Sequence, residues 1–149
     1  MYRIEITDYG VRFTLRGFVD QQEILRWAVD VRESTKSLAK GFCIFLDMRG
    51  MQPLPPDACN VMEKAQQAAI KAGMKRAVQV VDDPITRIQF KRLARRTGIS
   101  GIERQIDPST VPDWERAAMD WLIVGTDPNP DDPAETKIMR AFAEPEIPV

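Results

Sequence analysis

The stretch that decides the fold is Gly41 to Ala58, GFCIFLDMRGMQPLPPDA. Its first part, Phe42 to Met48, is almost continuously apolar, which is typical of a central strand covered on both faces. A proline-containing loop follows. Pro55, Pro56 and Asp57 suit a first helical turn, because proline fits its start and a carboxylate favours the positive helix end. We expect any working site to lie on this loop.

The segments before this stretch predict a hairpin and a helix. Residues 2–7 and 11–16 each alternate apolar and polar side chains, and a short turn containing Gly10 separates them. This pattern predicts an antiparallel pair of half-buried strands. Asp20 then has the properties of an N-cap, and the apolar spacing after it predicts a helix over about Gln21 to Leu38.

The segments after it continue an alternation of helix and strand. Small apolar residues, mostly alanine, recur at helical spacing over residues 58–72, which predicts a helix that lies close to the sheet. The remaining predicted elements are a buried strand at 77–81, a helix at 84–97, a short edge strand at 101–106 and a helix with an aromatic face from 114 to 122.

The predicted fold class is α/β, with a mixed sheet of about four or five strands and about four helices mainly on one face. A chain of 149 residues is long enough for one domain with a sizeable core. We place that domain at residues 1–124. Residues 125–149 form an acidic, proline-rich extension with six acidic and two basic residues, in which a short helix at 134–143 is predicted.

Composition excludes several kinds of chemistry. The chain is 44% hydrophobic and 29% charged with a net charge of -1, and no apolar run is long enough to span a membrane. With no signal peptide evident, we expect a cytoplasmic protein in which Cys43 and Cys59 are reduced. There is no histidine, and no nucleotide-binding loop or hydrolase elbow occurs. We therefore expect no catalytic residues, no metal site and no cofactor.

In order of elements, the chain resembles STAS domains, and in particular their SpoIIAA-like branch. Asp47-Met48-Arg49-Gly50 matches the Asp-X-X-Gly at the end of a strand in STAS antagonists of anti-sigma factors. The serine that a partner kinase phosphorylates in that family aligns with Asp57. The resemblance therefore implies an interaction module, with a partner such as an anti-sigma factor, but not its phosphorylation switch. The fold is also compared with lipid-binding SEC14 domains.

The candidate binding loop has two interpretations at several positions. Asp57 is either a fixed negative charge in place of a phosphate or an ordinary first-turn residue. Cys59 is either a thiol activated by the helix end or, as we favour, a small buried side chain. Asp47 is expected to accept hydrogen bonds from the loop. The candidate residues are Asp47, Arg49, Gly50, Asp57, Ala58 and Cys59.

A basic cluster in the helix at 84–97 is the second candidate surface. It is either a solvated face or a docking patch for an acidic partner, anionic lipid, RNA or the acidic extension. Nucleic acid is disfavoured because no aromatic side chain is interleaved on the exposed side. The cluster consists of Arg87, Lys91, Arg92, Arg95 and Arg96.

Taken together, the sequence favours a non-enzymatic STAS-like regulatory or protein-interaction module. The alternative is a protein that binds a small apolar molecule or a lipid in a pocket beside the helix at 58–72. A second copy of the chain, forming a homodimer, is a further candidate partner.

Overall fold

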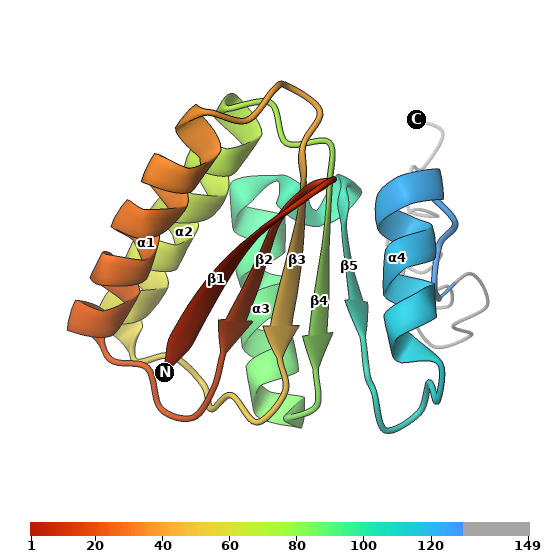
Figure 1. Ribbon diagram of the computed structural model, residues 1–149. Coiled ribbons are helices and arrows are strands. Elements are labelled where there is room, and N and C mark those ends of the chain that lie inside the picture. The colour runs from red at the N-terminus through yellow and green to blue at the C-terminus, as the bar shows by residue number, and fades with distance from the viewer. Residues whose placement is uncertain (130–149) are drawn as a thin grey trace, which may run out of the picture.

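The computed structural model describes residues 1–129, which form one mixed sheet flanked by helices (Figure 1). The strands are β1 (Tyr2–Thr7), β2 (Gly10–Leu15), β3 (Cys43–Met48), β4 (Arg76–Val81) and β5 (Glu103–Ile106). The helices are α1 (Gln21–Lys36), α2 (Pro56–Lys71), α3 (Pro84–Thr97) and α4 (Trp114–Val124), with a 3₁₀ turn at Ile99–Gly101. The predicted fold class and the order of its elements are confirmed.

The five strands lie in the sheet in the same order as in the chain. β1 is antiparallel to β2, and β2, β3, β4 and β5 are parallel to one another. Connections between parallel strands are almost always right-handed. Because the sheet grows in one direction only, the three crossover helices α1, α2 and α3 fall on one face, and α4 packs on the other.

The predicted helix ends are close to the observed ones, and the local chemistry explains the differences. The Asp20 side chain accepts a hydrogen bond from the Glu23 N–H, so α1 begins at Gln21 as predicted, although it ends at Lys36. α2 begins at Pro56, within the first helical turn that Pro55, Pro56 and Asp57 predict. Pro56 restricts the residue before it to extended backbone, and Pro55 lies there at ψ 157° as the N-cap.

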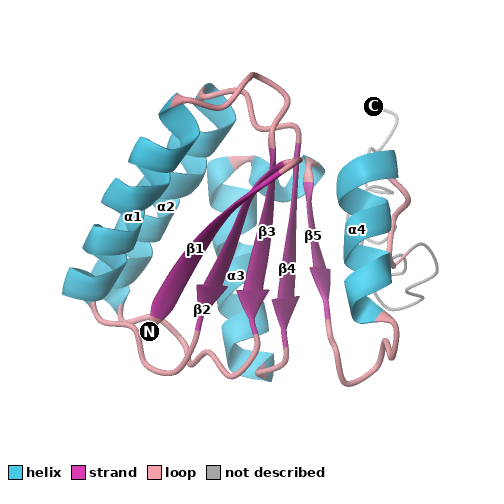
Figure 2. Cartoon of the chain, viewed as in Figure 1, coloured by secondary structure: helices cyan, strands magenta, loops and turns pink. Residues whose placement is uncertain are grey.

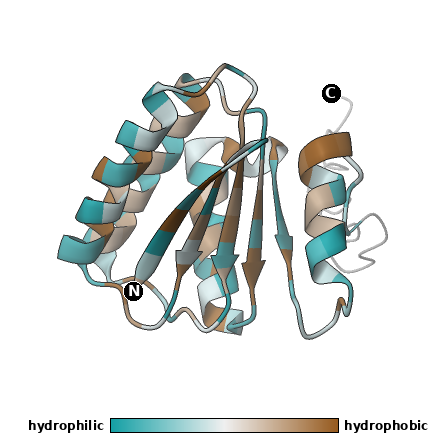
Figure 3. Ribbon diagram, in the orientation of Figure 1, coloured by the Kyte–Doolittle hydropathy of each residue, from teal (hydrophilic) through white to brown (hydrophobic). Residues whose placement is uncertain are grey.

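Two hydrophobic clusters, one on each face, hold the sheet. Figure 3 shows hydrophobic residues interspersed with hydrophilic ones along the strands. On the helix side, Phe13 packs edge-to-face against Trp27 of α1 within the larger cluster. On the other side, Phe45 lies with Trp121 of α4, whose indole N–H donates to the Ala77 carbonyl at 2.9 Å. All six residues of β3 are buried, so this strand is the central, doubly covered strand that the sequence predicts.

Two further predictions concern the extension and the membrane. Residues 125–129 run along β5, where Asp127 pairs with Arg104 and the Asn129 amide donates to the Gln105 carbonyl. The helix predicted at 134–143 lies outside the described residues. None of the helices within residues 1–129 has the length and apolar character needed to cross a bilayer.

Candidate functional site

The loops after β2, β3, β4 and β5 all lie at one edge of the sheet, the lower edge in Figure 2. This follows from the parallel arrangement of these strands, whose carboxyl ends point the same way. In open α/β sheets, ligands are generally bound at this edge. The loop between β3 and α2, residues 49–55, lies there.

Backbone hydrogen bonds attach the start of this loop to the exit of β2. The Gly17 N–H donates to the Gly50 carbonyl at 2.9 Å, and the Gln52 N–H donates to the Gly17 carbonyl at 3.0 Å. On the other side, the Gly50 N–H donates to an Asp82 carboxylate oxygen at 2.9 Å. Gly50 itself has φ +75°, a conformation that side chains rarely adopt.

Two side chains of α3 attach the rest of the loop. The Thr86 hydroxyl donates to the Met51 carbonyl at 3.1 Å. The Gln89 side-chain amide accepts from the Leu54 N–H at 2.7 Å and donates to the Leu54 carbonyl at 2.8 Å. The loop is therefore fixed at both ends before any partner binds.

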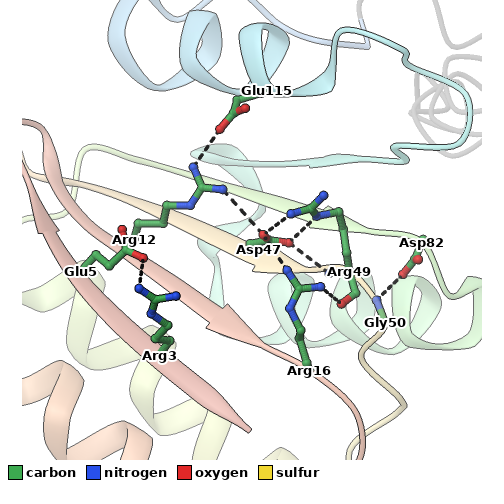
Figure 4. Close-up of polar contacts among 9 residues, drawn as sticks. All are labelled: Arg3, Glu5, Arg12, Arg16, Asp47, Arg49, Gly50, Asp82 and Glu115. Atoms are coloured by element: carbon green, nitrogen blue, oxygen red, sulfur yellow. Dashed lines mark hydrogen bonds and ion pairs between the residues drawn. The ribbon is translucent and has the colours of Figure 1, made fainter.

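Asp47 lies at the end of β3, and three arginines surround its buried carboxylate (Figure 4). Arg49 donates from Nε to Oδ1 at 2.9 Å and from Nη2 to Oδ2 at 2.8 Å, a two-pronged contact. Arg16 donates from Nη2 to Oδ2 at 3.3 Å, and Arg12 Nη2 lies 3.6 Å from the same oxygen. The Arg49 backbone N–H also donates to Oδ1, at 3.3 Å, as expected for a carboxylate at a strand end.

These contacts decide the charge state of Asp47. Burial by itself would raise the pKa of this carboxyl, but the hydrogen bonds from Arg49 and the charges of Arg49 and Arg16 outweigh it. The pKa of Asp47 is therefore lowered from its ordinary value, and the carboxylate is ionised at neutral pH.

Aromatic rings and α4 fix the arginines further. The Arg12 guanidinium lies 4.3 Å from the centre of the Phe45 ring, and the Arg49 guanidinium lies 4.4 Å from the centre of the Trp114 ring. Arg12 also donates to Glu115, in the first turn of α4, at 3.0 Å. Charged side chains from β2, β3 and α4 thus meet in one cluster, formed by Arg12, Arg16, Asp47, Arg49 and Glu115. We call it the arginine cluster.

Comparison with solved structures shows a similarity over most of the chain. It is to the crystal structure of an uncharacterized protein of the DUF3478 family from Shewanella loihica PV-4, which has a SpoIIAA-like fold. The match covers 82% of this chain and 92% of that chain, with a TM-score of 0.58 and 13% sequence identity. This chain has a SpoIIAA-like fold. The sequence matches no family model and no curated protein.

The predicted residues at the start of α2 lie in an ordinary first helical turn. Asp57 is exposed in the first helical turn, where its carboxylate accepts from the Ala58 N–H at 2.8 Å. Ala58 is buried. Cys59 is half-buried, and its pKa is raised, first by burial and then by the nearby Glu63 charge. These surroundings favour the interpretation of Cys59 as a small packed side chain rather than an activated thiol.

The basic cluster on α3 is divided between different neighbours. Arg87 donates to Asp107, after β5, at 3.0 Å, and Arg96 lies 3.0 Å from Glu63 of α2. Arg92 and Arg95 are exposed, while Lys91 is half-buried. Two of the five predicted cations therefore make ion pairs that connect α3 to its neighbours.

Sequence reasoning missed most of the arginine cluster. Arg12 and Arg16 were predicted only as the polar side of a half-buried strand. They lie instead on the face that α4 partly covers, next to Asp47, because β2 is an inner strand paired with β3. No local signal in the sequence marks these arginines, because charged residues alternate with apolar ones on any half-buried strand.

A second polar group lies between the sheet and α3. Gln105 of β5 donates to the Gln79 side chain at 3.2 Å and to the Arg87 carbonyl at 3.1 Å. Glu103, two residues earlier, has the same orientation along β5 and is buried. Burial raises the pKa of Glu103 to about 8. We call Gln79, Glu103 and Gln105 the polar seam.

On the outer surface of the helix layer, α1 and α2 border a groove of about 410 Å³. Half of its lining residues are alanines, and three others are cationic. Lining residues are Ala28, Val31, Arg32, Thr35, Lys36, Ala65, Ala68, Ala69, Lys71 and Ala72. The groove lies beside the helix for which the sequence predicts a pocket.

Proposed function

We propose that this protein is a non-enzymatic regulatory module that binds a protein partner at the carboxyl edge of its sheet. The contact surface consists of the loop at 49–55 and the start of α2, together with Phe18 and Ile85. The observation that carries the proposal is a fixed loop flanked by two large, exposed apolar side chains. The side chains of Phe18 and Ile85 are 59% and 61% exposed, respectively.

The chain connects both apolar side chains directly to the loop anchors. Phe18 follows Gly17, which forms a bridge with Met51, and Ile85 precedes Thr86, which donates to the Met51 carbonyl. A surface ordered before binding loses less conformational entropy when a partner binds. Large apolar and aromatic side chains near the centre of such a surface contribute most of the binding energy in many interfaces.

The non-enzymatic part of the proposal is supported by the state of the buried carboxylate. A general base needs a free lone pair and a pKa near the working pH. Asp47 instead accepts from three arginine N–H groups and one backbone N–H, and its pKa is lowered. Asp57, the other candidate carboxylate, is exposed in the first turn of α2.

The proposal predicts that apolar truncation at this surface abolishes partner binding. Tagged protein with both Phe18→Ala and Ile85→Ala is expected to capture at least roughly tenfold less partner from a native lysate, since central apolar contacts carry much of the affinity. Val29→Ala is the matched control, because Val29 on α1 is 59% exposed but lies on another surface. Quantitative mass spectrometry of the captured proteins provides the measurement.

Two results would contradict this surface. One is a partner that the double variant retains, and the other is a partner that Val29→Ala loses equally. Asp57→Ala, Asp57→Ser and Asp57→Lys in the same assay test the helix start. Unchanged capture by all three would remove Asp57 from the contact surface.

The groove between α1 and α2 supports a second candidate function, the binding of a small apolar molecule. Its volume of about 410 Å³ falls in the range of ligand pockets, and the small alanine side chains leave this space between the helices unfilled. Ala68→Phe would fill the groove, whereas Ala39→Phe places the same ring on the exposed loop after α1. We expect native mass spectrometry to show a copurified ligand that only Ala68→Phe removes. A ligand retained in Ala68→Phe, or none in the wild type, would exclude this function.

A further inference from the structure

The arginine cluster has more cationic donors than its own acceptors use. Each guanidinium carries five N–H groups. Within the described residues, Arg49 donates through Nε and Nη2 to Asp47. Arg16 donates through Nη1 to the Arg49 carbonyl and through Nη2 to Asp47, and Arg12 donates through Nη1 to Glu115. Most of the N–H groups of the three arginines are therefore available to another acceptor.

The carboxylate at the centre has no comparable spare capacity. Asp47 accepts four hydrogen bonds and is buried, so it does not compete for solvent or for a further cation. Its effect is to hold the arginines in place. Arginine side chains fixed in this way lose little entropy when they bind a planar or tetrahedral oxyanion.

Three guanidinium groups surround a single carboxylate at the centre of the cluster, and its other negative charges lie at its edge. Three arginines face one buried carboxylate, and the Glu115 side chain, 62% exposed, is paired only with Arg12 among the described residues. Asp82, which accepts from the Gly50 N–H at the loop, is a further exposed negative charge near Arg49. On β1, Arg3 and Glu5 pair with each other. The central part of the cluster is thus positive, and Glu115 and Asp82 are the exposed counter-charges at its edge.

The cluster is also accessible. The Arg16 and Arg49 side chains are 39% and 36% exposed, respectively. α4 packs over β3, β4 and β5, so the neighbouring part of β1 and β2 on this face has no helix over it. Figure 4 shows the three guanidinium groups converging beside Asp47, with Glu115 reaching the cluster from α4.

We propose that Arg12, Arg16 and Arg49, held in position by Asp47, form a binding site for a phosphate monoester. Forked guanidinium groups bind phosphate through paired hydrogen bonds, and clustered arginines are a usual means of recognising phosphorylated groups. A bound phosphate takes the place of Glu115 as a counter-charge of the cluster. The site shares Arg49 with the partner surface proposed above but does not depend on a protein partner.

The test measures phosphate binding to the isolated full chain at constant ionic strength. Inorganic phosphate and O-phosphoserine are titrated with chloride as the balancing anion, and binding is followed by calorimetry and by the Nε–Hε NMR signals of arginine. We expect saturable binding with signal changes at Arg16 and Arg49. Arg16→Gln is expected to weaken it roughly tenfold or more, and Arg92→Gln, an exposed arginine on α3, to leave it unchanged.

A gain-of-affinity variant excludes loss of folding as the explanation. Glu115→Gln removes one exposed counter-charge, so we expect it to strengthen phosphate binding several-fold, with unchanged circular dichroism. No saturable binding, equal effects of Arg16→Gln and Arg92→Gln, or no gain in Glu115→Gln would each overturn the site. None of these results would affect the partner-capture experiment, so the two proposals fail independently.

The source of the phosphate is distinguished with phosphoserine peptides of mixed sequence. A phosphopeptide that binds at least roughly tenfold more tightly than O-phosphoserine would identify a phosphorylated protein segment as the ligand, since neighbouring residues then contribute. Equal affinities would identify a small phosphorylated molecule. Both outcomes support the site.

Discussion

Replacing Glu103 by glutamine is expected to raise the free energy of unfolding by about 3 kcal/mol at pH 7. Glu103 is buried on β5, and among residues 1–129 its carboxyl makes neither a hydrogen bond nor an ion pair. Burial raises its pKa to about 8, so the folded protein holds a proton at neutral pH that the unfolded chain releases. Glutamine has nearly the same shape and does not need this proton.

Because the pKa of Glu103 is raised in the folded protein, the free energy of unfolding falls as pH rises. Between the ordinary pKa of 4.5 and about 8, only the folded state holds the proton. The wild type therefore loses stability by up to about 1.4 kcal/mol for each pH unit as pH rises through this window. Glu103→Gln should lose this contribution to the slope.

Urea unfolding at pH 5.5, 7.0 and 8.5 provides the measurement. Glu5→Gln is the control, because Glu5 is exposed on β1, and it should change neither the stability nor the slope appreciably. Parallel pH profiles of Glu103→Gln and the wild type would mean that Glu103 is ionised in the folded protein. The carboxyl would then not be buried without a partner.

The elements that the sequence predicted well depend on local chemistry. The hairpin follows from period-two alternation in β1 and β2, and α1 begins where Asp20 caps it. β3 is apolar except for Asp47 because helices cover both faces. The alanines of α2 do mark a close approach, but to α1 rather than to the sheet as predicted, although Ala58 and Ala69 are buried in the core.

The arginine cluster and the polar seam depend instead on how the strands pair and on which helix packs on each face of the sheet. Arg12 reaches Asp47 only because β2 pairs with β3 in this register, and Glu115 joins them only because α4 packs back on the far face. Glu103 belongs to an edge strand, where a glutamate normally reaches water, but here it is buried. Such contacts between distant segments leave no local pattern in the sequence.

The two buried carboxylates show how partners decide the charge state. Asp47 and Glu103 are both nearly inaccessible to water. Arginine hydrogen bonds lower the pKa of Asp47, whereas Glu103 has no such partners and its pKa rises. Replacing the carboxyl by an amide should therefore have opposite effects at the two sites, stabilising at Glu103 and destabilising at Asp47.

Asp47→Asn is accordingly expected to lower the free energy of unfolding by about 2 to 4 kcal/mol at pH 7. The substitution leaves three guanidinium groups around an uncharged amide whose N–H₂ group cannot accept from them. Loss of a buried partner commonly costs about 3 to 5 kcal/mol, and we expect slightly less because the arginines are partly exposed and keep some contact with water. The loop at Arg49 also loses its attachment to β3.

At acid pH, the wild type and Asp47→Asn should become similar in free energy of unfolding. A carboxyl whose folded pKa is lowered stabilises the fold above its ordinary pKa of 3.8, and this stabilisation disappears as pH falls through the folded pKa. The deficit of Asp47→Asn should thus be complete at pH 7 and shrink below pH 3.8. Urea unfolding at pH 7 and pH 3 measures it, with Asp57→Asn as the exposed-carboxylate control. A deficit that is equal at both pH values, or no larger than that of Asp57→Asn, would mean that the ionised carboxylate does not hold the arginine cluster together.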